Sequence, residues 1–253
     1  MHMLTPAFVA LLLQGSLIRS QPCNGNAFYD LGSNRGDTVE HWYKGEIGFH
    51  KLLLGQPESD PWRYCVSTFE ANPKWTPILK HLRDSLAPKA KASHGALHVY
   101  TDTAVSVANG TITMYIDTSA AAGGSTIVKE KTVRYGAVPT EVKAINFPEL
   151  FGRETRRKSE RPAGSRVIVR IDIEGAEYDI IEALFQRGLV CDRIDVMVVE
   201  FHYSKFKNSS LPADIDTQIR GRLAACGVEV WEYGGARVIG TKSYGTGGIG
   251  RTA

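Results

Sequence analysis

A short apolar stretch that leads directly into a glycine-containing turn constrains the fold of this chain most strongly. Residues 28–37 read FYDLGSNRGD, and a helix-like segment starts with Thr38-Val-Glu-His. Gly32 and Gly36 allow a tight turn, and they let a ligand approach the backbone where no Cβ stands in the way. A strand, a glycine-rich turn and a helix in this order are typical of α/β folds that bind nucleotide cofactors.

Length and composition limit the class of protein. The 253 residues are 43% hydrophobic and 23% charged, as in a soluble globular protein with one sizeable core. The net charge of +3 is too small to favour nucleic acid as a partner. The four cysteines include no C-x-x-C pair, which disfavours a zinc site or a thioredoxin-like centre. Cys191 and Cys226 lie in apolar contexts and are expected to be buried thiols.

The N-terminal segment has two interpretations. Residues 4–18 are mostly apolar and lead to Ser20-Gln21-Pro22, as in the hydrophobic region of a secretory signal. No Lys or Arg precedes them, so the alternative is a helix packed on the sheet of a cytoplasmic protein. The segment is too short and interrupted to predict a membrane span. We therefore expect residues 1–20 to be a signal or a helix, 21–242 a single domain, and 243–253 a flexible tail.

Strand and helix patterns alternate along the chain and predict a mostly parallel sheet with helices on both faces. The strand patterns cover residues 27–31, 64–69, 96–100, 141–145, 167–173, 193–201, 228–231 and 237–239. The helix patterns cover residues 77–86, 176–186 and 211–226. The β-branched run over 167–173 is typical of a strand buried on both faces.

Two segments stand outside this alternation. Residues 103–107 and 111–116 flank the turn Ala108-Asn109-Gly110 and predict a hairpin. Residues 153–166 read RETRRKSERPAGSR, and six of them are basic. Such a composition favours a solvated surface loop, with contacts to an acidic or phosphorylated partner as the alternative.

Carboxylates end five of the predicted strands. They are Asp30, Glu70, Asp102, Asp172 and Glu200. Parallel strands joined by right-handed crossovers end at one edge of a sheet, and ligands of such sheets bind at that edge. Because an unpaired carboxylate is costly to bury, the coincidence indicates a binding site there.

The spacing of the glycine turn selects among cofactors. Gly32 and Gly36 lie four residues apart with Asn34 between them, which is not the dinucleotide fingerprint. The form D-x-G-x-N-x-G-D matches the one that methyltransferases use for S-adenosyl-L-methionine. Backbone N–H groups of the turn would then face the methionyl part, and Glu70 would accept both ribose hydroxyls. A nicotinamide-dependent Rossmann enzyme is the alternative that this spacing disfavours.

A second motif, IDIEGAE, follows the buried strand pattern directly. Asp172 is expected to point into the cleft. Glu174 and Glu177 lie at the start of a helix, where negative charge is favourable, so an acid that only complements the helix dipole is an alternative for Glu177. His202 follows the next strand, and its pKa suits it to accept a proton near neutrality.

Five blocks in this order resemble the FkbM family of S-adenosyl-L-methionine-dependent methyltransferases. They are DLGSNRGD (30–37), FEANP (69–73), TAVS with NGT (103–106 and 109–111), RIDIEGAE (170–177) and VEFH (199–202). The resemblance covers roughly residues 27–239 and implies a Rossmann-like class I methyltransferase fold with a seven-stranded sheet. It also implies methylation of a hydroxyl oxygen on a sugar, polyketide or similar metabolite. Arg170 departs from the lysine that the family often has.

The family pattern also assigns roles to residues. It implies cofactor binding by Asp30, Gly32, Asn34, Gly36, Asp37 and Glu70, a place near the adenine for Asp102 and Ala104, and a place near the reacting methyl for Asp172. The sulfonium is already activated, so the protein mainly aligns donor and acceptor. Asp172 or His202 is the expected base for the acceptor hydroxyl, without a metal. A variant uses Asp172, Glu174 and Glu200 as ligands of a divalent cation.

Two further classes of function remain as alternatives. A secreted or scaffold module could retain the fold without catalysis, and it would bind no cofactor. A nucleic-acid methyltransferase is disfavoured, because the basic patch is confined to residues 153–166 and the N-P-P-Y motif of amino-group methylation is absent. The expected partner is therefore a small hydroxylated acceptor, with a membrane reached only through the N-terminal segment.

Overall fold

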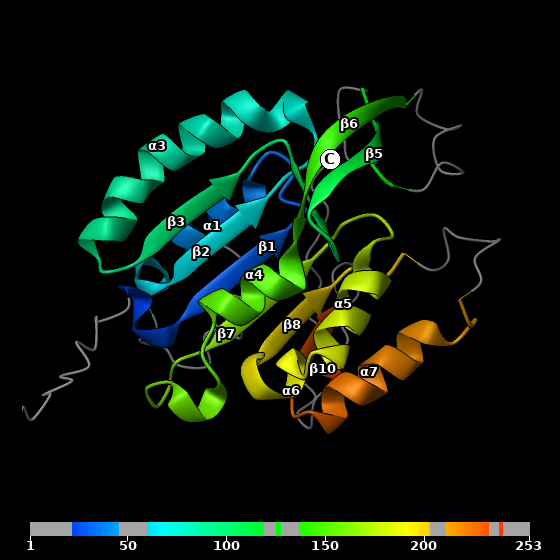
Figure 1. Ribbon diagram of the computed structural model, residues 1–253. Helices are drawn as coiled ribbons and strands as arrows, with labels where there is room; N and C mark the ends of the chain where they lie inside the picture. Colours follow the sequence, from blue (N-terminus) through cyan, green and yellow to red (C-terminus); the bar gives the residue numbers. More distant parts are fainter. Residues whose placement is uncertain are drawn as a thin grey trace, which may run out of the picture.

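The central feature of the fold is a seven-stranded sheet in the order β10-β9-β8-β7-β1-β2-β3 (Figure 1). The computed structural model describes residues 22–45, 60–118, 125–127, 137–202, 211–232 and 238–239. The strands are β1 (Ala27–Leu31), β2 (Cys65–Phe69), β3 (Ala96–Tyr100), β7 (Val167–Ile171), β8 (Val196–Val199), β9 (Glu229–Glu232) and β10 (Val238–Ile239). Neighbours from β9 to β3 pair in parallel, and β10 pairs with β9 antiparallel. The predicted mostly parallel sheet is confirmed, with six strands rather than seven in its parallel part.

Helices cover both faces of this sheet, as predicted (Figure 1). One face carries α1 (Asp37–Lys44) and α3 (Thr76–Ala92), and the other carries α4 (Phe147–Glu154), α5 (Glu177–Gln186), α6 (Leu189–Arg193) and α7 (Ile215–Ala225). Successive side chains of β1 enter different cores because strand side chains alternate between faces. Phe28 stacks on Trp42 of α1 with ring centroids 4.3 Å apart, whereas Tyr29 and Leu31 join the core under α4 and α5.

Three further strands form a small second sheet in the order β4-β6-β5. They are β4 (Thr103–Ser106), β5 (Gly110–Ile116) and β6 (Val138–Asn146). The predicted hairpin of residues 103–107 with 111–116 is wrong, because β6 lies between the two strands, parallel to β4 and antiparallel to β5. Ala144 of β6 pairs with both Ala104 and Gly110. The turn at residues 108–110 predicted that β4 and β5 pair with each other. Instead, both pair with β6, which begins about thirty residues downstream of β4.

Several elements end at other residues than the sequence patterns predicted. The helix α3 continues beyond residue 86, through Pro88 to Ala92, because Ala90 packs into the core beside α1. The strand predicted over 193–201 is shorter, because α6 ends at Arg193 and β8 begins at Val196. Short buried helices and short buried strands have similar apolar sequences, so the pattern alone did not separate them.

The cysteines are paired, so the prediction of buried thiols at Cys191 and Cys226 is wrong. Disulfides join Cys23 to Cys65 and Cys191 to Cys226, with Cα atoms 5.4 and 4.5 Å apart. The first bond ties the segment before β1 to the first residue of β2. The pairing could not be read from the sequence, because four cysteines allow three connectivities.

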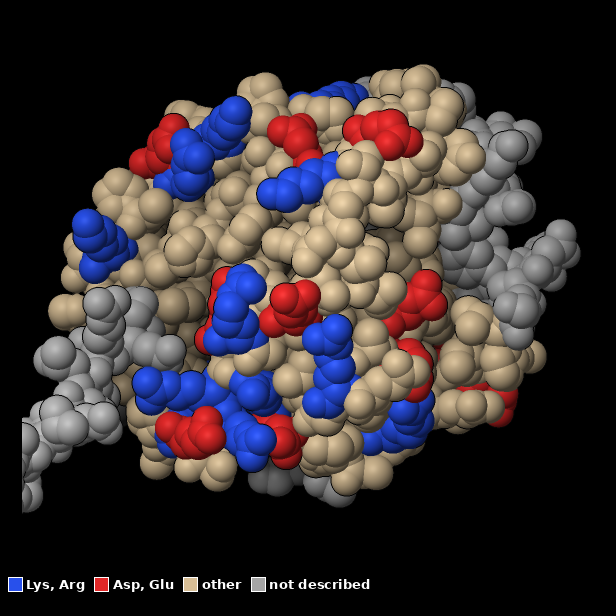
Figure 2. Space-filling model, viewed as in Figure 1, with Lys and Arg blue, Asp and Glu red and all other residues tan. Residues whose placement is uncertain are grey.

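The basic segment 153–166 lies largely exposed on the surface, as predicted, but ion pairs attach it to the domain. It contains the end of α4 and a short 3-10 turn at Lys158–Glu160. The Arg161 side chain is 3% exposed and binds both carboxylate oxygens of Asp195, at 2.7 and 3.0 Å. Lys and Arg lie beside Asp and Glu over this part of the surface (lower left in Figure 2). The acids that pair with these basic side chains therefore belong to the chain itself.

The predictions for residues 1–20 and 243–253 lie outside the described residues. No helix within the described ranges is long and apolar enough to cross a membrane.

Candidate cofactor and acceptor site

A pocket opens at the carboxyl edge of the sheet, where the strand order reverses. From β1 the chain continues to β2 and β3 on one side, and later returns to β7 and β8 on the other. Ligands of open α/β sheets bind in the crevice at such a reversal. The pocket encloses about 650 Å³ of empty space, including its open mouth. The glycine turn, the end of β2, the small second sheet and the turn after β7 line it.

The glycine turn lies over the ends of β2 and β7. Gly32 has φ +86°, and a Cβ at this position would collide with the backbone oxygen of Asp172. The N–H groups of Gly32 and Ser33 both donate to Phe69 O at 3.0 Å, and Asn34 N–H donates to Glu70. These N–H groups therefore point at protein oxygens rather than at a ligand. What the turn offers the pocket is the bare Cα of Gly32 and the side chain of Asn34.

Glu70 lies on the pocket wall, as predicted for a residue that meets the cofactor. Its Oε2 accepts Asn34 N–H and its Oε1 accepts Asn72 N–H, each at 2.7 Å. Burial raises the pKa of this carboxyl to about 7, although the two N–H donors act to lower it. An ionised carboxylate has about four acceptor positions, so both oxygens can still accept a hydroxyl.

The remaining predicted cofactor residues lie at different depths. Ala104 is on the pocket wall beside Met114 of the small sheet. Asp30 is fully buried below the pocket, where Thr68 Oγ1 donates to its Oδ2 at 3.1 Å. Asp37 is exposed at the start of α1, next to Arg35. Neither of these two carboxylates lines the pocket.

Gly36 and Asp102 are also set back from the pocket. Gly36 has φ +86° and precedes α1, where a Cβ would lie 2.6 Å from Leu82 of α3. Its need for glycine therefore comes from helix packing. Asp102 is exposed and accepts a hydrogen bond from Thr76 Oγ1 at 2.8 Å. Whether either residue contacts a bound cofactor stays a prediction.

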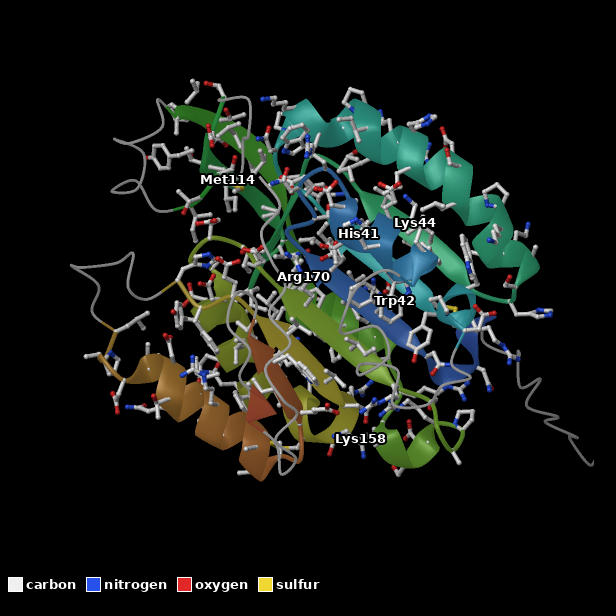
Figure 3. The ribbon with its side chains drawn as sticks, turned by 180° about the vertical axis from the view of Figure 1, so that it is seen from behind. His41, Trp42, Lys44, Met114, Lys158 and Arg170 are labelled. Carbon is white, nitrogen blue, oxygen red and sulfur yellow. A yellow bond between two sulfur atoms is a disulfide. The ribbon has the colours of Figure 1, made fainter. Side chains whose placement is uncertain are left out.

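Arg170 joins the buried part of the site to the pocket, and the sequence analysis assigned it no role. Its Nη1 donates to Asp30 Oδ1 at 2.8 Å and to Gly32 O at 3.1 Å, and its Nη2 donates to Asp172 Oδ2 at 2.8 Å. Figure 3 shows Arg170 in the middle of the sheet, with Met114 on the strands of the small sheet. The signal that could have found it is a basic residue inside an otherwise apolar, fully buried strand pattern.

Asp172 occupies the predicted position, on the pocket wall directly after β7. Burial raises its pKa to about 6 against the lowering effect of Arg170. Glu200 adds to the rise, whereas His202 opposes it. A carboxylate with a pKa just below neutrality is ionised at pH 7 and is also basic enough to accept a proton.

His202 lies behind Asp172, and Glu177 fixes the orientation of the His202 ring. The imidazole is fully buried, and the His202 Nδ1 and backbone N lie 2.8 and 3.0 Å from Glu177 Oε1. Burial acts to lower the pKa of His202, but Glu177 and Glu200 raise it more, to about 9. At neutral pH the ring therefore keeps its proton, and Asp172 is the better candidate base.

Glu177 does more than complement the dipole of α5. Its side chain is fully buried, and its Oε2 accepts Gly175 N–H at 2.6 Å. Both carboxylate oxygens are therefore used to shape the turn and to orient His202.

A short segment that carried no sequence signal, residues 125–127, contributes to the pocket wall. Thr126 Oγ1 donates to Glu174 O at 2.7 Å, and Thr126 forms an isolated bridge to Tyr115 of β5. Ser125 Oγ accepts from Asn72 Nδ2 at 3.2 Å.

Comparison with known proteins adds the family to this geometry. No curated protein and no solved structure matched the chain. The family model described as the methyltransferase FkbM domain matches residues 30–229, a range that contains the glycine turn, Glu70, Asp172 and His202. The chain therefore belongs to the FkbM family of methyltransferases and has its class I methyltransferase fold.

Proposed function

We propose that this methyltransferase transfers a methyl group from S-adenosyl-L-methionine to a hydroxyl oxygen of a sugar or another small metabolite. The observation that carries the proposal is the position of Asp172. This carboxylate, whose pKa is about 6, lies on the wall of the same pocket as the bare Cα of Gly32. The pocket thus combines a surface that a nucleoside can approach closely with a base for an acceptor.

The residues present fit such a cofactor. Gly32 lets the turn lie directly against the backbone of Asp172, which a Cβ would prevent, and its bare Cα lies on the pocket wall. Glu70 offers carboxylate oxygens to the ribose hydroxyls, and Ala104 and Met114 offer a small apolar surface to the adenine. S-adenosyl-L-methionine supplies a methyl group on a positively charged sulfur, which is already a good leaving group.

The protein then has to orient the acceptor and remove its proton. Asp172 accepts the proton of the hydroxyl as the oxygen attacks. Arg170 holds Asp172 Oδ2 at 2.8 Å, which directs the other oxygen away from the guanidinium. Arg170 is thus a positioning residue, and its own contacts to Asp30 and Gly32 fix it to β1.

The first experiment is calorimetric titration of the purified protein with S-adenosylhomocysteine, with NAD as a comparison. We expect binding of S-adenosylhomocysteine and none of NAD. Gly32→Ala is expected to abolish binding, because its Cβ meets the backbone oxygen of Asp172. The matched control is Gly188→Ala, since Gly188 also has positive φ but an added Cβ there meets nothing within 4 Å.

Each other outcome points to a different class of protein. A folded protein that binds neither compound would be a non-catalytic module that has retained the fold. Binding of NAD alone would indicate a nicotinamide-dependent enzyme. If S-adenosylhomocysteine binds, Asp172→Asn should retain that binding and lose turnover with a hydroxylated acceptor. Unchanged turnover in Asp172→Asn would contradict the proposed base.

A further inference from the structure

Three side chains that can bind a metal come together where two neighbouring strands end. Asp172 follows β7, and Glu200 and His202 follow β8, which pairs with β7 in parallel. A carboxylate oxygen of each acid and a ring nitrogen of His202 lie within 4.8 Å of one another. Within the described part of the chain, no other group of histidine, cysteine and acidic residues meets this condition.

His202 presents a buried nitrogen without a hydrogen-bond partner to this group. The residue is 0% exposed, and its Nε2 forms no hydrogen bond with any of the residues that the structure describes. This nitrogen lies 3.8 Å from Asp172 Oδ1 and 3.4 Å from Glu200 Oε1. Two atoms that bind the same ion at about 2.0–2.2 Å are roughly 3 to 4 Å apart, so these separations suit ligands of one cation. An unpaired buried polar atom otherwise costs about 1–3 kcal/mol.

Glu177 fixes the orientation that a ligand histidine needs. The ring is protonated at neutral pH, so a cation has to displace the proton of Nε2. With Nδ1–H donating to Glu177 Oε1 at 2.8 Å, the ring then presents a lone pair on Nε2, which faces Asp172 and Glu200. Metal-binding histidines commonly donate their second ring N–H to a carboxylate in this way, which sets the tautomer and the ring plane. Because Glu177 is itself fully buried and bound to Gly175 N–H, this arrangement is rigid.

The charges around Nε2 also favour a cation. Glu174 Oε1 is 3.6 Å away, so three carboxylates face the same nitrogen. Arg170 binds Oδ2 of Asp172, whereas the oxygen nearest His202 Nε2 is Oδ1. Like charges this close repel one another strongly at a partly buried site, and a divalent ion between them offsets that repulsion.

We propose that Asp172, Glu200 and His202 bind a divalent cation beside the pocket. Two carboxylate oxygens and one imidazole nitrogen suit a transition-series ion such as Mn²⁺ better than Ca²⁺, which takes oxygen ligands only. Three protein ligands leave coordination positions open for water or for a hydroxyl.

The catalytic consequence rests on the proposed function. A cation at this place lowers the pKa of an acceptor hydroxyl that binds it. With the cation bound, Asp172 is one of its ligands, and Glu174, which lines the pocket, takes the proton that Asp172 takes in the metal-free protein. Loss of the Asp172 carboxylate therefore abolishes turnover with or without the cation. The acceptor oxygen forms its bond to the methyl carbon as the carbon–sulfur bond breaks, and S-adenosylhomocysteine leaves with the electron pair.

The test is titration of the chelator-treated full-length protein with MnCl₂, followed by the electron paramagnetic resonance signal of free Mn²⁺. Neither cofactor nor acceptor is needed. We expect one site per chain, and we expect Glu200→Gln to weaken binding at least about tenfold. Glu200 is one-third exposed, so its replacement should leave the fold intact, which thermal unfolding checks. Glu182→Gln, an exposed acid paired with Arg222 on the neighbouring helix, is the matched control and should bind normally.

A second variant distinguishes binding by the three proposed ligands from nonspecific binding of the ion to an acidic surface. Glu177→Gln retains every proposed ligand but weakens the contact that orients His202, so we expect binding to fall roughly 10–100-fold. Binding that is equal in wild type, Glu200→Gln and Glu177→Gln would place the ion elsewhere. No binding by the folded wild type would leave a proton as the partner of Nε2, and the proposal would be wrong. Because S-adenosylhomocysteine binding is measured separately, failure of the cation site and failure of the proposed methyl transfer are distinguishable.

Discussion

At the scale of single residues, the site depends on a few buried charges that hold one another in place. Asp30 is fully buried between the Thr68 hydroxyl and the Arg170 guanidinium, and the same guanidinium binds the pocket carboxylate of Asp172. A charge so buried is tolerated only with its partner. The carboxylate at the base of the site therefore supports the carboxylate in the pocket through Arg170.

Arg170→Gln should destabilise the protein by about 3 kcal/mol or more, because it leaves the Asp30 charge buried without its counter-ion. Chemical denaturation measures the free energy of unfolding. The double variant Asp30→Asn/Arg170→Gln is expected to recover part of the loss, since the uncompensated charge is then gone. A loss below about 0.5 kcal/mol in the single variant would show that the ion pair is not what holds this region.

The affinity for S-adenosylhomocysteine should depend on the ionisation of Glu70. Its pKa is about 7 because of burial, so the carboxyl is largely protonated at pH 6 and ionised at pH 8. The ionised form accepts ribose hydroxyls better, and we expect the Kd to fall as the pH rises through 7. Glu70→Gln should bind weakly at both pH values. A wild-type Kd that is constant from pH 6 to 8 would argue against this role.

The raised pKa of Glu70 affects protein stability in the opposite direction from cofactor binding. The pKa of Glu70 in the folded protein lies above its ordinary value of 4.5, so the folded state holds more protons between these two values. The contribution of this group to stability is therefore present below about pH 4.5 and is lost as the pH rises through about 7. Cofactor binding thus favours the ionised carboxylate of Glu70, whereas folding favours its protonated form.

At the scale of elements, ion pairs attach the basic segment after α4 to the central sheet. Asp195 precedes β8, and its Oδ2 accepts both Arg161 Nη1 and the Val167 N–H of β7 at 2.7 Å. The segment, the start of β7 and the start of β8 are thereby joined at one carboxylate. The sequence showed the excess of basic residues but not their acidic partners. These include Asp192 in α6 and Asp195 just after it.

Arg161→Ala should lower the free energy of unfolding by about 3 kcal/mol, because its partner Asp195 is mostly buried and would lose its counter-ion. Arg157→Ala is the control from the same segment. Arg157 is 60% exposed and lies 3.9 Å from Asp192, so its loss should change stability by less than about 0.5 kcal/mol. Equal effects of the two substitutions in urea unfolding would show that the pair of Arg161 and Asp195 does not attach the segment to the domain.

At the scale of the whole molecule, two disulfides fasten segments that are distant in sequence. They close loops with separations of 42 and 35 residues. Bonds of this kind persist in oxidising compartments and are rare in the cytosol.

Loss of the Cys23–Cys65 bond is expected to reduce stability by about 4 kcal/mol, because the unfolded chain regains the entropy of an open loop. The double variant Cys23→Ser/Cys65→Ser, compared with wild type in thermal unfolding, measures the effect. A reductant should lower the melting temperature of the wild type further, since it also opens Cys191–Cys226. Free thiols found in the unreduced wild type would contradict the pairing.

Local sequence patterns were enough to predict the parallel sheet, the glycine turn and the family. The sheet and the turn follow from patterns within a few residues: apolar runs make strands, and glycine at position 32 allows the turn. The family follows from five such short blocks in a fixed order. The positions of Glu70 and Asp172 on the pocket wall followed in turn, because parallel strands end at one edge. The hairpin at residues 103–116 failed for the opposite reason, since the competing strand came from far along the chain.

Long-range packing, which local patterns do not show, settles which strand-end acids face the pocket and what their partners are. Asp30 and Asp172 follow the same local rule, yet one is fully buried and the other lines the pocket. Asp30 lies within β1, between neighbouring strands, whereas Asp172 follows the last residue of β7. Their shared partner Arg170 is 140 residues from Asp30 in sequence. The pairing of the cysteines and the contact of Glu177 with His202 are also long-range. Side-chain partners depend on which strands become neighbours, and periodicity within a strand carries no information about that choice.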